Sequence, residues 1–156
     1  MTPTPVWERQ APQRERYRDR PEDARIVDEA RSEGPSARDP YHSTVTPGTE
    51  YELAVPVGVH RGVGGLHDAP NSGELLCAAL ASCQDTTIRM VADLFGVEIR
   101  SLTVTVEGDV DLRGTLQMAQ DVRVGFTDLR CHVDITVDAA TAPGHLERML
   151  EIAQTA

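Results

Sequence analysis

The sequence predicts an α+β fold in which strands flank one long, buried helix. The first observation is an apolar helical segment from about Ser72 to Phe95, the longest in the chain. The second is that apolar residues alternate in stretches on both sides of it, as in strands with one buried face. The third is length, because 156 residues suit one domain of ordinary size with an appendage.

The N-terminal segment, up to about residue 40, is a polar arm. It is rich in Arg, Glu, Asp and Pro and nearly empty of large apolar residues. One short helix is expected from about Pro21 to Ser32, because proline suits a first helical turn and the following Gly34-Pro35 would stop it. We expect the rest of the arm to be mobile or to pack on a partner subunit. The chain then divides into an arm, 1–40, and a domain, 41–156.

The domain is expected to begin with a strand, because apolar residues alternate over 51–59. Gly62, Gly64 and Gly65 interrupt this pattern. The segment lacks the third glycine and the Lys-Ser/Thr ending of nucleotide-binding loops. A turn is therefore expected here rather than a phosphate site.

The long helix has clear signals at both ends. Asn71 is expected to cap its start, with Glu74 three residues on as in a capping box, and Gly96 is expected to end it. Both faces are apolar over 75–81. A helix that is apolar all round is buried on most sides.

The segments after the helix predict further strands and a second helix. Alternation over 102–106, 122–126 and 129–137 indicates strands, and Gly114 marks a turn or bulge between them. A second amphipathic helix begins at Pro143. Its apolar face consists of Leu146, Met149, Leu150 and Ala153.

Composition and charge argue against several kinds of partner and location. The formal net charge is −10, which repels nucleic acid and anionic membranes. No stretch has the apolar length of a membrane span, and residues 1–20 have no apolar region of a secretory signal. We therefore expect a cytoplasmic protein, in which three cysteines argue against a disulfide scaffold.

The cysteines and histidines give no catalytic pattern by spacing alone. Cys131 lies on the apolar side of a predicted strand and is expected in the core. Cys77 and Cys83 lie about 120° apart around the long helix and about 9 Å apart along it. A disulfide between them is excluded, because it needs Cα atoms within about 7 Å. Periodicity alone also favours a buried, inert Cys83.

The five histidines are scattered without zinc-site spacing, so neither a metal nor a cofactor is expected.

The run from Gly64 to Cys83 resembles the hallmark of the OsmC/Ohr family. In that family a Gly-Gly turn and an Asn-Pro-Glu-type cap precede a buried helix that carries a cysteine. The segments 96–114 and Gly125-Phe126 are also similar, and the resemblance covers about residues 45–156. It implies an OsmC-like fold, a domain-swapped homodimer and a peroxidatic cysteine aligned with Cys83.

The resemblance also implies a chemistry and its partners. The thiolate attacks a hydroperoxide and becomes a sulfenic acid, while a nearby arginine lowers the thiol pKa and orients the peroxide. A glutamate often holds that arginine. A second cysteine then closes a disulfide, which a dithiol such as dihydrolipoamide reduces.

This sequence departs from the family pattern at three places. The glutamate position falls on Gly73, and Glu74 is about 100° further round the helix. Arg38 is the closest match to the arginine by spacing, and Arg61 is the alternative. The second cysteine would follow the segment that ends at Ala156, so we expect either a truncated version of a longer protein or a protein that lacks this cysteine. A final helix and strand are expected to be absent as well.

Three hypotheses follow for the function. The first is a thiol peroxidase that acts on organic hydroperoxides in oxidative stress defence through Cys83, with Arg38 and Glu74 as further site candidates. The second is a non-catalytic OsmC-fold dimer that binds a small apolar or oxidised ligand. The third is an interaction role for the arm, which would wrap a partner subunit.

Overall fold

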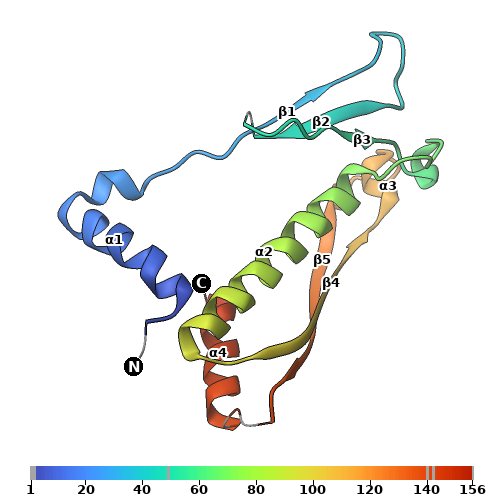
Figure 1. The fold of residues 1–156 in the computed structure, drawn as a ribbon. Helices are drawn as coiled ribbons and strands as arrows, with labels where there is room; N and C mark the ends of the chain where they lie inside the picture. The colour runs from blue at the N-terminus through green and yellow to red at the C-terminus, as the bar shows by residue number, and fades with distance from the viewer. Residues whose placement is uncertain (1–2, 49, 140, 142, 156) are drawn as a thin grey trace. The chain divides into compact units, whose positions relative to one another are not determined.

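The computed structural model describes residues 3–48, 50–139, 141 and 143–155. Along the chain it contains these elements: α1 (Pro5–Asp19), η1 (Pro21–Ala24), β1 (Ala30–Glu33), β2 (Ser43–Pro47), β3 (Val55–Val57), η2 (Arg61–Val63), α2 (Ser72–Phe95), β4 (Ile99–Val110), α3 (Leu112–Thr115), β5 (Phe126–Val137) and α4 (Pro143–Thr155) (Figure 1). This mixture of helices and antiparallel strands confirms the predicted α+β class.

The described chain forms two compact units, each built from segments that are distant in sequence. The first unit combines Met1–Ile26, Leu80–Thr105 and Cys131–Ala156. The second combines Val27–Ala79 and Val106–Arg130. The elements α2, β4 and β5 therefore each contribute residues to both units.

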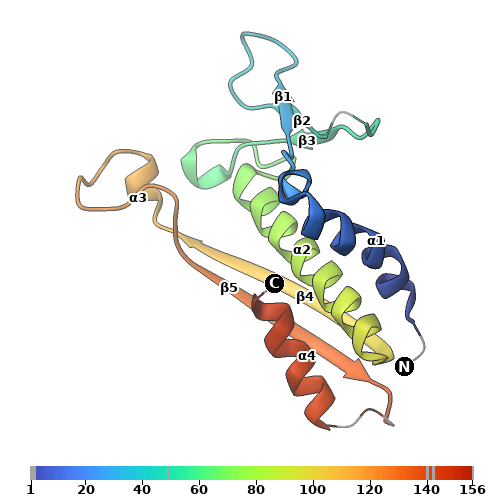
Figure 2. The ribbon, with the colours of Figure 1, turned by 90° about the vertical axis from the view of Figure 1, so that its left-hand side faces the viewer.

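Two sheets contain the strands. β1, β2 and β3 form an antiparallel sheet in that order, with Ala30 opposite Pro47 and Ser43 opposite Val57. β4 and β5 pair with each other and run side by side in opposite directions (Figure 2). The backbone bond from Asp138 N to Glu98 O, 2.9 Å, closes this pair at its end in the first unit.

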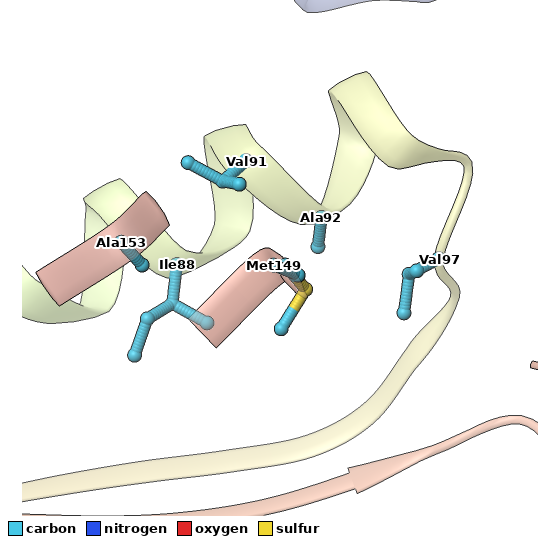
Figure 3. Close-up of a cluster of buried hydrophobic side chains, with 6 residues drawn as sticks. All are labelled: Ile88, Val91, Ala92, Val97, Met149 and Ala153. Atoms are coloured by element: carbon cyan, nitrogen blue, oxygen red, sulfur yellow. The ribbon is translucent and has the colours of Figure 1, made fainter. Parts of the chain in front are cut away.

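The core of the first unit lies where α2 meets α4. Ile88 is 1% exposed and Met149 is 0% exposed, and both point into a cluster that Val91, Ala92, Val97 and Ala153 complete (Figure 3). The predicted apolar face of α4 is confirmed, because Leu146, Met149, Leu150 and Ala153 all pack in or against this cluster. Apolar residues of β4 and β5 cover it from the strand side.

Both end signals of α2 are confirmed. Asn71 Oδ1 accepts hydrogen bonds from Gly73 N and Glu74 N at 2.8 and 3.2 Å. The Glu74 carboxylate accepts from Asn71 N at 2.8 Å, which completes the capping box. At the other end Gly96 has φ +65°, a left-handed conformation that suits glycine and stops the helix.

The N-terminal arm differs from the prediction. Its helix is α1, Pro5–Asp19, and the helix expected over about Pro21 to Ser32 is wrong, because only the short 3₁₀ turn η1 forms there before β1. Thr4 Oγ1 accepts from Trp7 N and Pro5 occupies the first turn, which are the start signals that set α1. No residue of α1 is buried in the described chain.

Two further predictions are wrong in detail. No strand forms over 122–125, because Gly125 has φ +91° and β5 begins only at Phe126. Cys131, expected in the core, is exposed, since the buried cluster includes β5 residues only from Ile135 onwards. The predicted turn at Gly114 is confirmed: it lies in α3, buried against the backbone of Arg123.

No helix in the described part of the chain combines the length and apolar character needed to cross a membrane.

Candidate functional site

Cys83 lies in the middle of α2 and its side chain is exposed in the single chain. Its carbonyl oxygen accepts a hydrogen bond from Thr86 Oγ1 at 3.0 Å. Among the residues that the structure describes, no side chain forms a hydrogen bond with Cys83 Sγ, and Cys77, Cys83 and Cys131 are all free thiols. Cys83 is therefore open to a reagent from solvent or to a partner surface.

Three large apolar side chains are exposed on the side of α2 that carries Cys83: Leu76, Leu80 and Met90, which are 44%, 39% and 43% exposed. The polar residues Ser82, Thr86 and Arg89 are exposed beside them. The three apolar residues recur with Cys83 at spacings of four, three and seven, which places them on one side of the helix. We call this apolar set the Cys83 stripe. The expectation that α2 is buried on most sides is wrong for the single chain, because only Ile88, Val91 and Ala92 are buried along it.

The two candidate arginines are placed on ordered turns of the second unit. Arg38 lies in the loop between β1 and β2, where its backbone N–H donates to Ser36 Oγ at 3.2 Å. Arg61 begins η2 and lies next to the His60 cap of that turn. Within the described ranges, neither guanidinium forms an ion pair. Cys83 belongs to the first unit, so its pairing with either arginine stays a prediction.

Glu74 is held by the start of α2. One carboxylate oxygen accepts from Asn71 N, as described above, so this side chain already has a structural role in the cap. Like the arginines, Glu74 belongs to the second unit. Its part in chemistry at Cys83 stays a prediction.

Gly73, which the sequence resemblance aligns with a glutamate of the peroxidase members, lies beside the ring of Phe126. A Cβ at Gly73 would lie 3.0 Å from Asn71 Oδ1 and 3.4 Å from Phe126 Cζ. The same ring lies directly against Gly108 on β4, where a Cβ would overlap it. A Cβ at position 73 would therefore lie tightly against the capping Asn71 and at ordinary contact distance from Phe126.

A histidine between two aspartates joins the Arg38 loop to the turn before α2. His42 Nδ1 lies 2.8 Å from Asp39 Oδ2, and His42 Nε2 lies 3.1 Å from Asp68 Oδ2. The hydrogen bonds to Asp39 and Asp68 raise the pKa of His42 above its usual value. The pKa of Asp68 is lowered chiefly by its hydrogen bond to His42, and that of Asp39 by the Tyr41 N–H and then by His42.

Sequence reasoning missed this Asp39–His42–Asp68 bridge. The partners of His42 lie three and 26 residues away, which matches no metal or catalytic spacing. The nearest available signal is the pair Asp39 and His42 in one polar loop, which predicts a local contact but not the link to Asp68.

A shallow hollow of about 550 Å³ lies beside the start of α2 in the second unit. Its lining includes the polar residues His67, Asp68 and Glu74 and the apolar residues Leu75 and Ala78. His67 Nδ1 is buried and has no hydrogen-bond partner in the described part of the chain. The hollow thus combines apolar and polar lining residues, a composition suited to a small ligand.

The described residues contain no group of three or more His, Cys, Asp or Glu side chains able to hold a metal ion.

The family model described as OsmC-like protein matches residues 65–156, more than half of the chain. The chain belongs to the OsmC-like family. The match includes α2 with Glu74 and Cys83, whereas Arg38 and Arg61 precede it. No curated protein sequence matches the chain significantly.

Solved structures of OsmC-like proteins show the same fold. An OsmC-like protein of unknown function from Vibrio cholerae has a TM-score of 0.65 and 14% identity, covering 84% of this chain and 89% of its own. An OsmC-like protein from Mycoplasma pneumoniae has a TM-score of 0.63 and 11% identity, with 83% and 82% covered. An organic hydroperoxide resistance protein from Legionella pneumophila has a TM-score of 0.60 and 20% identity, with 85% of each chain covered.

Proposed function

We propose that this OsmC-like chain is a thiol peroxidase that reduces organic hydroperoxides in oxidative stress defence, with Cys83 as the peroxidatic cysteine. The observation that carries the proposal is the exposed thiol of Cys83 on α2, inside the region that matches the family. The Legionella pneumophila relative, an organic hydroperoxide resistance protein, supports the substrate class.

The proposed oxidation is a single displacement at oxygen. The Cys83 thiolate attacks the terminal oxygen of the hydroperoxide, a sulfur–oxygen bond forms and the O–O bond breaks. The leaving alkoxide takes up a proton and departs as the alcohol. Cys83 is left as a sulfenic acid, oxidised by two electrons.

The proposed return to the thiol uses an external dithiol, for example dihydrolipoamide. One thiol of the reductant attacks the sulfenic sulfur, so that a mixed disulfide forms and water leaves. The second thiol then attacks this disulfide, closes the reductant's own disulfide and releases Cys83. This cycle needs no second protein cysteine, which fits the exclusion of a Cys77–Cys83 disulfide in an intact α2.

Arg38 is our candidate for the cation that stabilises the thiolate and the departing alkoxide, with Arg61 as the alternative. The support for Arg38 is its ordered loop together with a guanidinium that has no ion-pair partner in the described chain. Glu74 is the weaker candidate for holding that arginine, because its carboxylate already serves the helix cap.

We further propose that the protein works as a homodimer in the cytoplasm. The support for dimerisation is the Cys83 stripe, which exposes three large apolar side chains on one helix face. A second copy that covered this stripe would also remove water from around Cys83, which strengthens charge interactions there.

The test is direct detection of the oxidised thiol. The protein is mixed with one equivalent of cumene hydroperoxide and a sulfenic-acid trap, and the modified residue is located by mass spectrometry. Trapping is expected at Cys83 and absent in Cys83→Ser, whereas Cys77→Ser and Cys131→Ser should behave as wild type. Absence of modification at Cys83, or equal peroxide loss in Cys83→Ser, would contradict the proposal.

The second candidate is a non-catalytic protein that binds a small apolar or oxidised ligand. It is favoured by glycine at position 73, where the resemblance aligns a glutamate of the peroxidase members, and by the hollow beside the start of α2. If it is correct, Cys83 reacts with peroxide no faster than an ordinary thiol of pKa about 8.5.

A further inference from the structure

The loop that carries Arg38 is held in place by side chains on both sides of the arginine. Asp39 N donates to Ser36 O at 3.1 Å, and Asp39 Oδ1 accepts from the backbone N–H groups of Tyr41 and His42 at 2.9 and 3.2 Å. These bonds fix the shape of the loop. They do not attach it to any other element.

His42 supplies that attachment. Its ring lies between Asp39 in the same loop and Asp68 in the turn before α2, with both ring nitrogens at hydrogen-bond distance from a carboxylate. A neutral imidazole carries one N–H, so it can donate to only one of the two. The protonated ring donates to both. The bridge is therefore complete only in the imidazolium form.

We propose that His42 is a positioning residue, which ties the Arg38 loop to the turn before α2 while it is protonated and releases the loop when it becomes neutral. Asp39 and Asp68 are the charged groups that face the ring in the described chain. Both are half-exposed, so solvent can reach the bridge and protonation can follow the surrounding pH.

The direction of the pH effect follows from the charges. Because the pKa of His42 is raised in the folded chain, the tie is complete below the unfolded value of about 6.5 and is lost as pH rises through the folded value. The pKa values of Asp39 and Asp68 are lowered, so at the acid end the tie is lost only as pH falls through their folded values. The tie is strongest in mildly acidic solution.

The consequence for Cys83 rests on the proposed function. If Arg38 stabilises the departing alkoxide, then a loop that is tied by protonated His42 presents the guanidinium in one place, and a released loop does not. His42 would act on the reaction only through Arg38.

The first measurement is amide hydrogen exchange of the segment 36–42 at pH 6 and pH 9, corrected for the intrinsic effect of pH. Wild type should exchange about two- to fivefold faster at pH 9 than at pH 6, the range expected for one partly exposed ion pair. His42→Asn and Asp68→Asn should exchange fast at both pH values. His145→Asn, an exposed histidine on α4, is the matched control and should follow wild type. If the exchange rate of the segment 36–42 changed neither with pH nor in His42→Asn, the proposed tie between the loop and the turn would be wrong.

The second measurement is the rate of sulfenic acid formation at Cys83 with cumene hydroperoxide at pH 6 in wild type, His42→Asn, Arg38→Gln and the double variant. His42→Asn should slow wild type but should not slow Arg38→Gln further. Equal slowing in both backgrounds would overturn the action through Arg38. A wild-type Cys83 that is inert to the peroxide would instead refute the proposed function, while the exchange measurement still decides the tie.

Discussion

Gly73 is the residue at which this chain differs most clearly from the peroxidase pattern. The Phe126 ring lies over it and also against Gly108, so two glycines on different elements accept one aromatic side chain. The resemblance aligns Gly73 with a glutamate of the peroxidase members, and this chain has an aromatic ring beside that position instead. In our proposal, activation of the Cys83 thiol therefore relies more on Arg38, supported by His42, than on Glu74.

The close approach at Gly73 predicts an unusual response to alanine. Gly73→Ala should give no gain in the free energy of unfolding, because its Cβ would lie only 3.0 Å from Asn71 Oδ1. The matched control is Gly144→Ala in the first turn of α4, where a Cβ meets nothing within 4 Å. Alanine loses less backbone entropy on folding than glycine does. Gly144→Ala should therefore raise the free energy of unfolding by up to about 0.5–1 kcal/mol. Urea denaturation measures both, and an equal gain in the two variants would show that Gly73 is not crowded.

At the scale of elements, local signals were sufficient for α2 and α4 and for the central parts of β4 and β5. Capping residues, a terminal glycine and apolar periodicity act over a few residues, and the start and end predicted for α2 are the ones observed. Local signals also place Cys83 within its helix. They do not show that its side of the helix is uncovered, because exposure depends on which elements pack there.

The strand and the side-chain contacts that the sequence did not predict depend on pairing between segments that are distant in the chain. β1 has four exposed residues and no apolar alternation, and it becomes a strand only because β2 lies beside it. The contact of His42 with Asp68 and that of Phe126 with Gly73 also join segments that are far apart in sequence. Thr4 is a capping residue that the sequence contains, but the arm is so polar that no apolar pattern indicates the helix that follows it.

The packing of α2 on α4 predicts which substitution destabilises the first unit. Ile88→Ala should lower the free energy of unfolding by about 2–5 kcal/mol, because the side chain is 1% exposed and its removal leaves a cavity beside Met149. Glu147→Ala, on the exposed side of α4, is the control and should change stability by less than about 0.5 kcal/mol. Chemical denaturation followed by circular dichroism measures both. If both variants lowered the free energy of unfolding by similarly small amounts, Ile88 would lie outside the core.

At the scale of the whole molecule, the exposed apolar surface sets the expected assembly. Besides the Cys83 stripe, Leu129 and Val133 of β5 are 44% and 38% exposed in the single chain. An acidic surface with a net charge of −10 keeps chains apart unless such apolar surface draws them together. A homodimer is the assembly that we propose.

A substitution that introduces a charge into the Cys83 stripe tests the proposed dimer. Leu80→Glu should convert a particle of twice the 17.0 kDa chain mass into one of single mass, because a carboxylate would be buried without a partner. Met118→Glu is the control, since Met118 is 73% exposed in a loop outside the Cys83 stripe and should leave the mass unchanged. Analytical ultracentrifugation gives the mass. A wild-type monomer, or a Leu80→Glu dimer, would contradict the assembly.

The most direct test of the central claim is the second-order rate constant of Cys83 with cumene hydroperoxide, measured by stopped flow in a Cys77→Ser, Cys131→Ser background. The account predicts a rate about 10²-fold or more above that of a small-molecule thiol, because a positioned cation stabilises the departing alkoxide. It also predicts that Arg38→Gln removes most of this advantage. A rate equal to that of an ordinary thiol would contradict the account and favour a ligand-binding protein.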